Sequence, residues 1–302
     1  MTTRHFLSLL DLSPDELRGI ISRAMELKQM AGMPDHPDFM RGKTAVLVFE
    51  KSSTRTRISF ETGIGQFGGY GIFLAPSDSH LSRGESLEDT AKVLSRMADL
   101  IIMRTGPHLR IETMAANASV PVINGLSDYN HPCQLLADIQ AFTEHRGNIQ
   151  GHKVAWIGDG NNVCHSWMNA ARLLDFELKI ATPVDHRPAQ HLIKDCADFI
   201  ELTEDPFEAS RDASLIVTDT WSGMGYEKEK ETREQIFSDY CVTGEMMACG
   251  KADALFMHCL PAYRDFEVAT DVIDGPQSVV YQQGHNRLHS ARGAMAYLLG
   301  VR

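Results

Sequence analysis

The chain has 302 residues and carries 40 acidic against 29 basic side chains, for a formal net charge of −11. Its length predicts two α/β domains of about 150 residues, each large enough to bury a core. The acidic balance does not favour nucleic acid or a membrane surface as a partner, and no apolar run has the length of a signal peptide or a membrane-spanning helix. We therefore expect a cytoplasmic protein.

The six cysteines form neither a CxxC pair nor a zinc-finger pattern. In a cytoplasmic chain this spacing predicts reduced thiols, most of them in the core. We predict no metal site and no bound cofactor. The cysteines stand at positions 133, 164, 196, 241, 249 and 259.

The N-terminal segment predicts a helix with an apolar docking face, because Ser13 and Glu16 have the spacing of a capping box. The strand predicted next, at 44–49, leads into a run of hydroxyl and cationic side chains where a second helix would begin. A helix N-terminus attracts anions, so this stretch predicts a phosphate cradle. The residues concerned are Ser52, Ser53 and Thr54, with Lys51, Arg55 and Arg57.

Two features limit this prediction. Arg55 and Arg57 point in different directions on a helix, so we expect one to bind the anion and the other to brace the loop. The glycine-rich Walker pattern is absent, which favours a phosphorylated ligand smaller than a nucleoside triphosphate. The alternative is an ordinary capped helix with two surface arginines.

The rest of the first half alternates strands, predicted at 71–76, 99–105 and 119–124, with helices between them. This alternation predicts a parallel sheet covered on both faces. Ligands bind beyond the carboxyl ends of such strands, where we expect Lys51, Arg104 and the loop 124–134 to converge.

The second half repeats the alternation, beginning with a strand, a glycine turn and a helix at 153–162. The fold class is α/β, with two doubly wound parallel-sheet domains joined by helices. We place one domain at 1–133 and the other at 134–286, with a closing helix at 287–302 that packs back on the first. The further strands are predicted at 178–183, 199–204, 213–220, 254–261 and 278–283.

Three separated motifs connect the chain to a known family. KSSTRTR at 51–57, HPCQ at 131–134 and HCLP at 258–261 occur in the order found in the aspartate/ornithine carbamoyltransferases, and the chain resembles that family over nearly its whole length. The HCLP variant resembles the ornithine-using branch. The resemblance implies transfer of the carbamoyl group of carbamoyl phosphate to the δ-amine of L-ornithine, giving L-citrulline and phosphate in arginine biosynthesis. It also implies a homotrimer, or a multiple of trimers, with sites at subunit interfaces.

The reaction requires neutralisation of the departing phosphate, donors aimed at the carbonyl oxygen and an uncharged amine. The resemblance assigns the first domain to carbamoyl phosphate and the second to ornithine, with Arg55, Arg104, His131, Asp219 and Cys259 as catalytic. The resemblance assigns ornithine binding to Asn162, Asp219, Gly223, Met224 and Cys259. Carbamoyl phosphate is assigned to Ser53, Thr54, Arg55, Thr56, His80, Arg104, His131, Gln134, Leu260 and Arg287, with His80 acting in the neighbouring subunit.

The chain departs from the family pattern at two positions. Gly223 stands where an ornithine-contacting serine is expected, and His285 stands where an acidic residue is common. The alternative is therefore an enzyme that acts on another amine, such as an acylated ornithine, lysine or putrescine.

Two other classes of protein are alternative interpretations of the sequence. The GDG at 158–160 is typical of a nicotinamide-dependent dehydrogenase, but Val163 occupies the third glycine position of that pattern. A non-catalytic binding paralogue would keep the fold and lose motif residues, whereas all three motifs are intact here.

Overall fold

The computed structural model describes residues 3–33, 36–75, 77, 81, 84–221 and 230–301. His80, Gly223 and Met224, which the resemblance assigns to ligand contacts, lie outside these residues. The chain divides into two compact units, with Met1–Gln140 and His285–Arg302 in unit 1 and Ala141–Gly284 in unit 2. The divisions fall inside helices α5 (Pro132–Arg146) and α12 (Val280–Leu298), as do the boundaries predicted after 133 and after 286.

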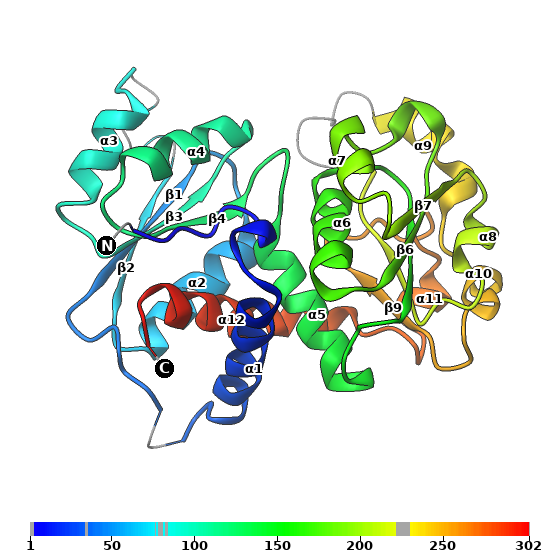
Figure 1. Cartoon of the computed structure of the whole chain (residues 1–302), viewed down its shortest axis with the longest axis horizontal. Coiled ribbons are helices and arrows are strands. Elements are labelled where there is room, and N and C mark those ends of the chain that lie inside the picture. The colour runs from blue at the N-terminus through cyan, green and yellow to red at the C-terminus, as the bar shows by residue number, and fades with distance from the viewer. Residues whose placement is uncertain are drawn as a thin grey trace. The chain divides into compact units, whose positions relative to one another are not determined.

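Unit 1 is built on a parallel sheet in the order β2-β1-β3-β4 (Figure 1). The last strand begins at Val122 rather than at 119. Pro121 has no N–H to donate to a ladder, and its carbonyl accepts the first bond, from Ile101 N. The strands are β1 (Thr44–Phe49), β2 (Tyr70–Leu74), β3 (Leu100–Arg104) and β4 (Val122–Leu126).

Helices cover both faces of this sheet (Figure 1). Helices α3 and α4 bury one face, where Val46, Ile101 and Met114 share a core cluster. Helix α2 covers the other face and packs against α12 at Gly63. The predicted capping box of Ser13 is present at the start of α1. The bounds are α1 (Pro14–Gln29), α2 (Thr54–Gln66), α3 (Leu87–Leu94) and α4 (His108–Asn117).

Unit 2 also has a parallel sheet, in the order β7-β6-β5-β8-β9, so the predicted fold class is confirmed. The strand predicted at 278–283 is wrong. Ser278 makes only an isolated bridge to Phe256, and α12 begins at Val280. Tertiary context outweighs the β propensity of these residues, since Val279 N bonds to Phe256 O while Val279 O already accepts a helical bond from Gln283 N. The strands are β5 (Lys153–Ile157), β6 (Glu177–Ala181), β7 (Ile200–Thr203), β8 (Leu215–Thr218) and β9 (Leu255–His258).

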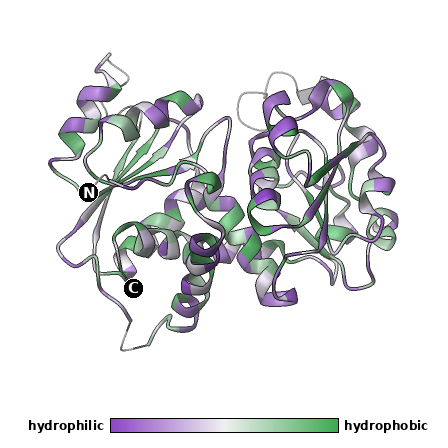
Figure 2. Cartoon of the chain, viewed as in Figure 1, coloured by the Kyte–Doolittle hydropathy of each residue, from purple (hydrophilic) through white to green (hydrophobic). Residues whose placement is uncertain are grey.

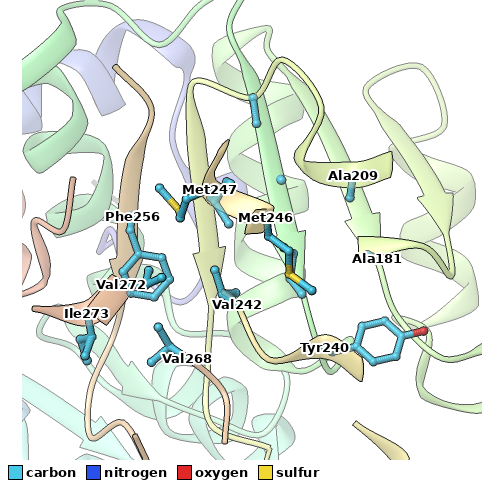
Figure 3. Packing of buried hydrophobic residues seen from close by; sticks show 14 of the residues in the cluster. Ala181, Ala209, Tyr240, Val242, Met246, Met247, Phe256, Val268, Val272 and Ile273 are labelled. Carbon is cyan, nitrogen blue, oxygen red and sulfur yellow. The ribbon is translucent and has the colours of Figure 1, made fainter. Parts of the chain in front are cut away.

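One core cluster of unit 2 lies between its strands and three short helices, α8, α10 and α11. Met246, Met247, Phe256 and Val272 meet in this cluster (Figure 3). Figure 2 shows the strands of both sheets mostly in the colour of apolar residues, as expected of sheets buried on both faces. The helices are α6 (Asn162–Leu174), α7 (Gln190–Asp195), α8 (Pro206–Ser210), α9 (Lys230–Ile236), α10 (Gly244–Cys249) and α11 (Thr270–Ile273).

Among the helices of the described residues, none combines the length and the apolar character that crossing a membrane requires.

The strand order of each sheet reverses direction at one place. In unit 1 the reversal lies between β1 and β3, and in unit 2 it lies between β5 and β8. Open parallel sheets bind ligands at such switch points, beyond the carboxyl ends of the strands. Each unit therefore presents one edge where a ligand is expected.

Candidate active site

The start of α2 forms the first part of the site in unit 1. Ser53 is the N-cap, and its Oγ accepts a hydrogen bond from Thr56 N at 3.3 Å. Arg57 forms an ion pair with Glu61, with 3.0 Å between Nε and Oε1. Its guanidinium lies 3.6 Å from the centre of the Phe73 ring. Arg57 is therefore held by its own helix and by β2, and its predicted role in bracing the loop stays a prediction.

Two buried arginines meet behind the helix start. Arg104 ends β3 and is 8% exposed, and Arg287 lies in α12 and is 4% exposed. Both donate to Thr56 Oγ1, at 3.5 Å and 3.0 Å respectively. Arg287 also donates to Gln134 Oε1, and Gln134 donates to Asp138 Oδ1 at 2.7 Å. Thr56, predicted as a phosphate contact, therefore also orients two of the cations.

His131 completes this group from the loop after β4. Burial, followed by the charges of Arg287, Arg104 and Arg55, holds the pKa of its imidazole well below the usual value. At neutral pH His131 is therefore an uncharged imidazole, which donates or accepts a hydrogen bond without adding a fourth positive charge. The structure brings together four predicted residues from separate segments, namely Arg55, Arg104, His131 and Arg287.

An ion pair that was not predicted joins the end of β1 to α4, and a hydrogen bond to the same carboxylate joins it to the end of β3. Glu50 accepts from Arg110 Nε at 3.1 Å and 2.9 Å with its two carboxylate oxygens, and it also accepts from Thr105 Oγ1. Lys51 lies close to the same turn, because a Cβ on Gly106 would be 3.6 Å from its Cε. The loop that carries the cationic motif is therefore fixed at its base.

Asp219, which follows β8, is the centre of the site in unit 2. It is 8% exposed. Its Oδ1 accepts from Cys259 Sγ at 2.9 Å and from Thr220 N at 2.7 Å, and its Oδ2 accepts from Asn161 Nδ2 at 2.8 Å. The predicted neighbours Asp219 and Cys259 are thus in contact. Asn161 was missed, although an asparagine before a helix is a typical N-cap, and Asn162 opens α6 beside it.

The HCLP turn brings a histidine to the same place. His258 is fully buried, and its Nδ1 accepts from Leu260 N at 2.9 Å. Leu260 has φ +56°, a region that branched side chains rarely adopt. Ligand atoms of Asp219, His258 and Cys259 lie within 4.8 Å of one another, and these are residue types that bind Zn²⁺. Both Asp219 oxygens and His258 Nδ1 already accept hydrogen bonds within the chain.

Two more charged groups lie at this switch point and were not predicted. Asp159, in the turn after β5, forms an ion pair with Arg233 of α9. Burial raises the pKa of Asp159 to about 6, against the lowering by Arg233 and with a further rise from Asp219. No local pattern marks this pair, because 74 positions separate its members.

The turn at 158–160 is built for close packing rather than for a dinucleotide. Asn161 Oδ1 accepts from Val163 N at 2.9 Å and from Cys164 N at 3.1 Å, so it occupies N–H groups that a pyrophosphate would need. A Cβ on Gly160 would lie 2.3 Å from Pro188 N. The glycine therefore admits a neighbouring backbone segment, and this geometry does not favour the dehydrogenase.

Comparisons with known proteins agree with the three motifs. Residues 4–144 match the family described as aspartate/ornithine carbamoyltransferase, carbamoyl-P binding domain, and residues 150–298 match the Asp/Orn binding domain of the same family. The chain is 52% identical to a protein named ornithine carbamoyltransferase from Nitrosococcus oceani, over 99% of this chain and 98% of that one. It is 50% identical to a protein of the same name from Halorhodospira halophila, over 98% and 99%.

Solved structures show the same likeness. The ornithine carbamoyltransferase of Pyrococcus furiosus matches with a TM-score of 0.94 and 42% identity, covering 99% of this chain and 98% of that one. The ornithine carbamoyltransferase of Burkholderia thailandensis matches with a TM-score of 0.91 and 44% identity, covering 98% of each chain.

Proposed function

Because the chain belongs to the aspartate/ornithine carbamoyltransferase family, we propose that it transfers the carbamoyl group of carbamoyl phosphate to the δ-amine of L-ornithine. The products are L-citrulline and inorganic phosphate. The observation that carries the proposal is the cluster of Arg55, Arg104 and Arg287 around a neutral His131 at the switch point of unit 1. Such a cluster suits a small phosphorylated carbonyl compound.

Unit 1 supplies the groups for carbamoyl phosphate. Ser53, Thr54 and Arg55, at the start of α2, bind the phosphate oxygens and neutralise the charge that grows as the C–O bond breaks. Arg104 and His131 donate to the carbonyl oxygen. Because His131 is neutral, its donor strength does not depend on a proton taken up near pH 7.

Unit 2 supplies the groups for the amino acid. The buried Asp219 carboxylate attracts an ammonium group, and Cys259 is fixed on it at 2.9 Å. The δ-amine has an ordinary pKa of about 10.4, so it must lose a proton before its lone pair attacks the carbamoyl carbon. A C–N bond forms and the bond to the phosphate oxygen breaks without a covalent enzyme intermediate. The proton that the attacking nitrogen then loses passes to the departing phosphate, which leaves as hydrogen phosphate.

The assembly proposed from the sequence is a homotrimer with sites at subunit interfaces. The edge strand β2 supports it, since Tyr70 is 69% exposed and Ile72 is 39% exposed, with Ile58 of α2 57% exposed. Light scattering of the active enzyme should give a trimer or a multiple of it. If His80 acts in a neighbouring subunit, mixing His80→Ala with Arg55→Gly protein should restore part of the activity through hybrid sites, whereas an active monomer would exclude this arrangement.

We also propose a role in arginine biosynthesis and a cytoplasmic location. Citrulline formation belongs to arginine biosynthesis. All six cysteines are free, which a reducing cytoplasm maintains.

A panel of amines tests the activity directly. Carbamoyl phosphate is supplied with ornithine, N-acetylornithine, lysine or putrescine, and the carbamoylated amine and released phosphate are both measured. We expect equal amounts of citrulline and phosphate with ornithine, and at least a hundredfold lower kcat/KM with the others. Preference for another amine would correct the substrate, and phosphate release without any carbamoylated amine would reject the transfer.

A further inference from the structure

The ion pair of Arg233 and Asp159 in unit 2 is too buried to be an ordinary surface contact. Arg233 is 4% exposed, and the Asp159 side chain is 14% exposed. A buried charge is tolerated only when it is paired and hydrogen-bonded. The Arg233 guanidinium meets this condition by using different nitrogens for two partners: Nη2 donates to the Asp159 carboxylate, and Nε donates to the Trp221 carbonyl oxygen.

Each partner of Arg233 is itself held in place. The Asp159 carbonyl oxygen accepts from Trp156 Nε1 at 3.0 Å. The Trp221 ring is 2% exposed and stacks on Phe237, with 5.5 Å between ring centres and 22° between planes. Arg233 lies over the same Phe237 ring at 5.2 Å. We call the set of Arg233, Asp159 and the Trp221 carbonyl the carboxylate latch.

The carboxylate latch holds the chain two residues beyond Asp219, the proposed contact for the amino acid. Asp219 is anchored by Asn161 and Cys259, and Trp221, two residues later, is anchored by Arg233. The backbone between them is therefore fixed from both ends by different elements.

From this arrangement we propose that Arg233 and Asp159 are positioning residues for amino-acid binding. They touch no reacting atom, and they act by holding the backbone of Trp221 in register with Asp219. The inference rests on the proposed function, which assigns the amino-acid site to Asp219 and names ornithine as the amino acid. A merely structural ion pair would contribute to stability and leave amino-acid affinity unchanged.

The charged and titratable groups around Asp159 make the carboxylate latch sensitive to pH. Arg233 of α9 and Asp219 after β8 face it, His186 Nδ1 is 3.9 Å from its Oδ1, and the nearby Cys164 thiol has a pKa well above its usual value. Since the pKa of Asp159 is about 6, acidification below that value neutralises the carboxylate and removes the partner of Arg233. We expect amino-acid affinity to fall there.

The test uses L-norvaline, which has the carbon chain of ornithine without the δ-amine and therefore does not titrate there between pH 5 and 8. Its dissociation constant is measured by calorimetry at saturating carbamoyl phosphate, for the wild type, Arg233→Lys and Asp159→Asn. Arg233→Lys keeps the charge and loses the two-pronged donor geometry. We expect at least tenfold weaker norvaline binding in both variants, with carbamoyl phosphate affinity within twofold of the wild type.

Arg264→Lys is the matched control, because Arg264 forms an exposed ion pair with Asp274 in the same unit, at 2.9 Å between Nη2 and Oδ1. It should leave norvaline binding unchanged. Lower thermal stability with unchanged norvaline affinity in Arg233→Lys would overturn the inference. If a variant does not fold, the norvaline affinity of the wild type is measured from pH 7.5 to pH 5. An affinity that stays constant over this range also overturns the inference. An altered amine preference in the wild type would correct the proposed substrate. The same comparison made with that amine's analogue would then support the inference if both variants bind it at least tenfold more weakly, and overturn it if they do not.

Discussion

The switch points of the two sheets carry opposite charges. In unit 1, Arg55, Arg104 and Arg287 surround an imidazole that they help to keep neutral. In unit 2, the carboxylates of Asp219 and Asp159 lie at the equivalent edge of a similar sheet, and burial raises the pKa of Asp159. The comparison teaches that the parallel sheet supplies the place and that the residues after the strands supply the chemistry. A cationic edge suits a leaving phosphate, and an acidic edge suits an ammonium group.

Removing Arg55, the cation proposed to bind the phosphate, should have the largest effect on activity. In Arg55→Gly, a charge-assisted contact and the stabilisation of the leaving group are lost together, so kcat/KM for carbamoyl phosphate should fall by about 1,000-fold. Arg57→Ala is the control from the same helix, because Arg57 pairs with Glu61 and Phe73. Steady-state kinetics of both variants measure this. Near-normal turnover in Arg55→Gly would show that the cationic edge is not the phosphate site.

Replacing the Asp219 carboxylate of unit 2 by an amide should have the next largest effect, on the KM for ornithine. Asp219→Asn keeps the shape of the side chain but removes a charged acceptor, and a hydrogen bond to a charged group contributes about 1.5–3 kcal/mol. The KM for ornithine should rise by about 10- to 100-fold. The KM for carbamoyl phosphate should stay within twofold, and a parallel rise in both would contradict the separation of roles between the units.

The pH profile should distinguish the two edges. At limiting ornithine the rate should rise about tenfold per pH unit between pH 6.5 and 8, because the free amine fraction rises below a pKa of about 10.4. His131 should not add an inflection, since the pKa of its imidazole lies well below the usual value. His131→Gln should therefore be slower but have the same slope, and a changed slope would show that His131 titrates during the reaction.

The smallest effect should come from the departure at Gly223. A serine at this position restores the hydrogen bond that the family pattern expects, with a contribution of roughly 0.5–1.5 kcal/mol. Gly223→Ser should therefore lower the KM for ornithine by up to about tenfold. Steady-state kinetics with ornithine and lysine check this, and preference for lysine in both forms would point to a different substrate.

Most of the fold could be predicted because apolar strand runs alternate with capped helices. The strand wrongly predicted at 278–283 has a local cause, since Val279, Val280 and Tyr281 favour strands. Only the tertiary hydrogen bond from Val279 N to Phe256 O shows where the chain turns into α12.

The site could be predicted to different extents in the two units. The helix-start cations lie within one continuous motif, so a phosphate cradle at the start of α2 could be predicted from local sequence, and it stays a prediction. The pairs Glu50–Arg110 and Asp159–Arg233 join residues 60 and 74 positions apart, and no spacing rule connects them. The contact of Asp219 with Cys259 was expected from the family resemblance alone.

Equilibrium binding of a phosphonate analogue of carbamoyl phosphate, with CH₂ in place of the bridging oxygen, tests the division of roles most directly. Calorimetry compares the wild type, Arg55→Gly and Asp219→Asn. We predict that Arg55→Gly weakens binding by at least a hundredfold while Asp219→Asn binds within twofold of the wild type. Equal weakening by the two substitutions, or none by Arg55→Gly, would contradict a phosphate site in unit 1 that is independent of the acidic edge of unit 2.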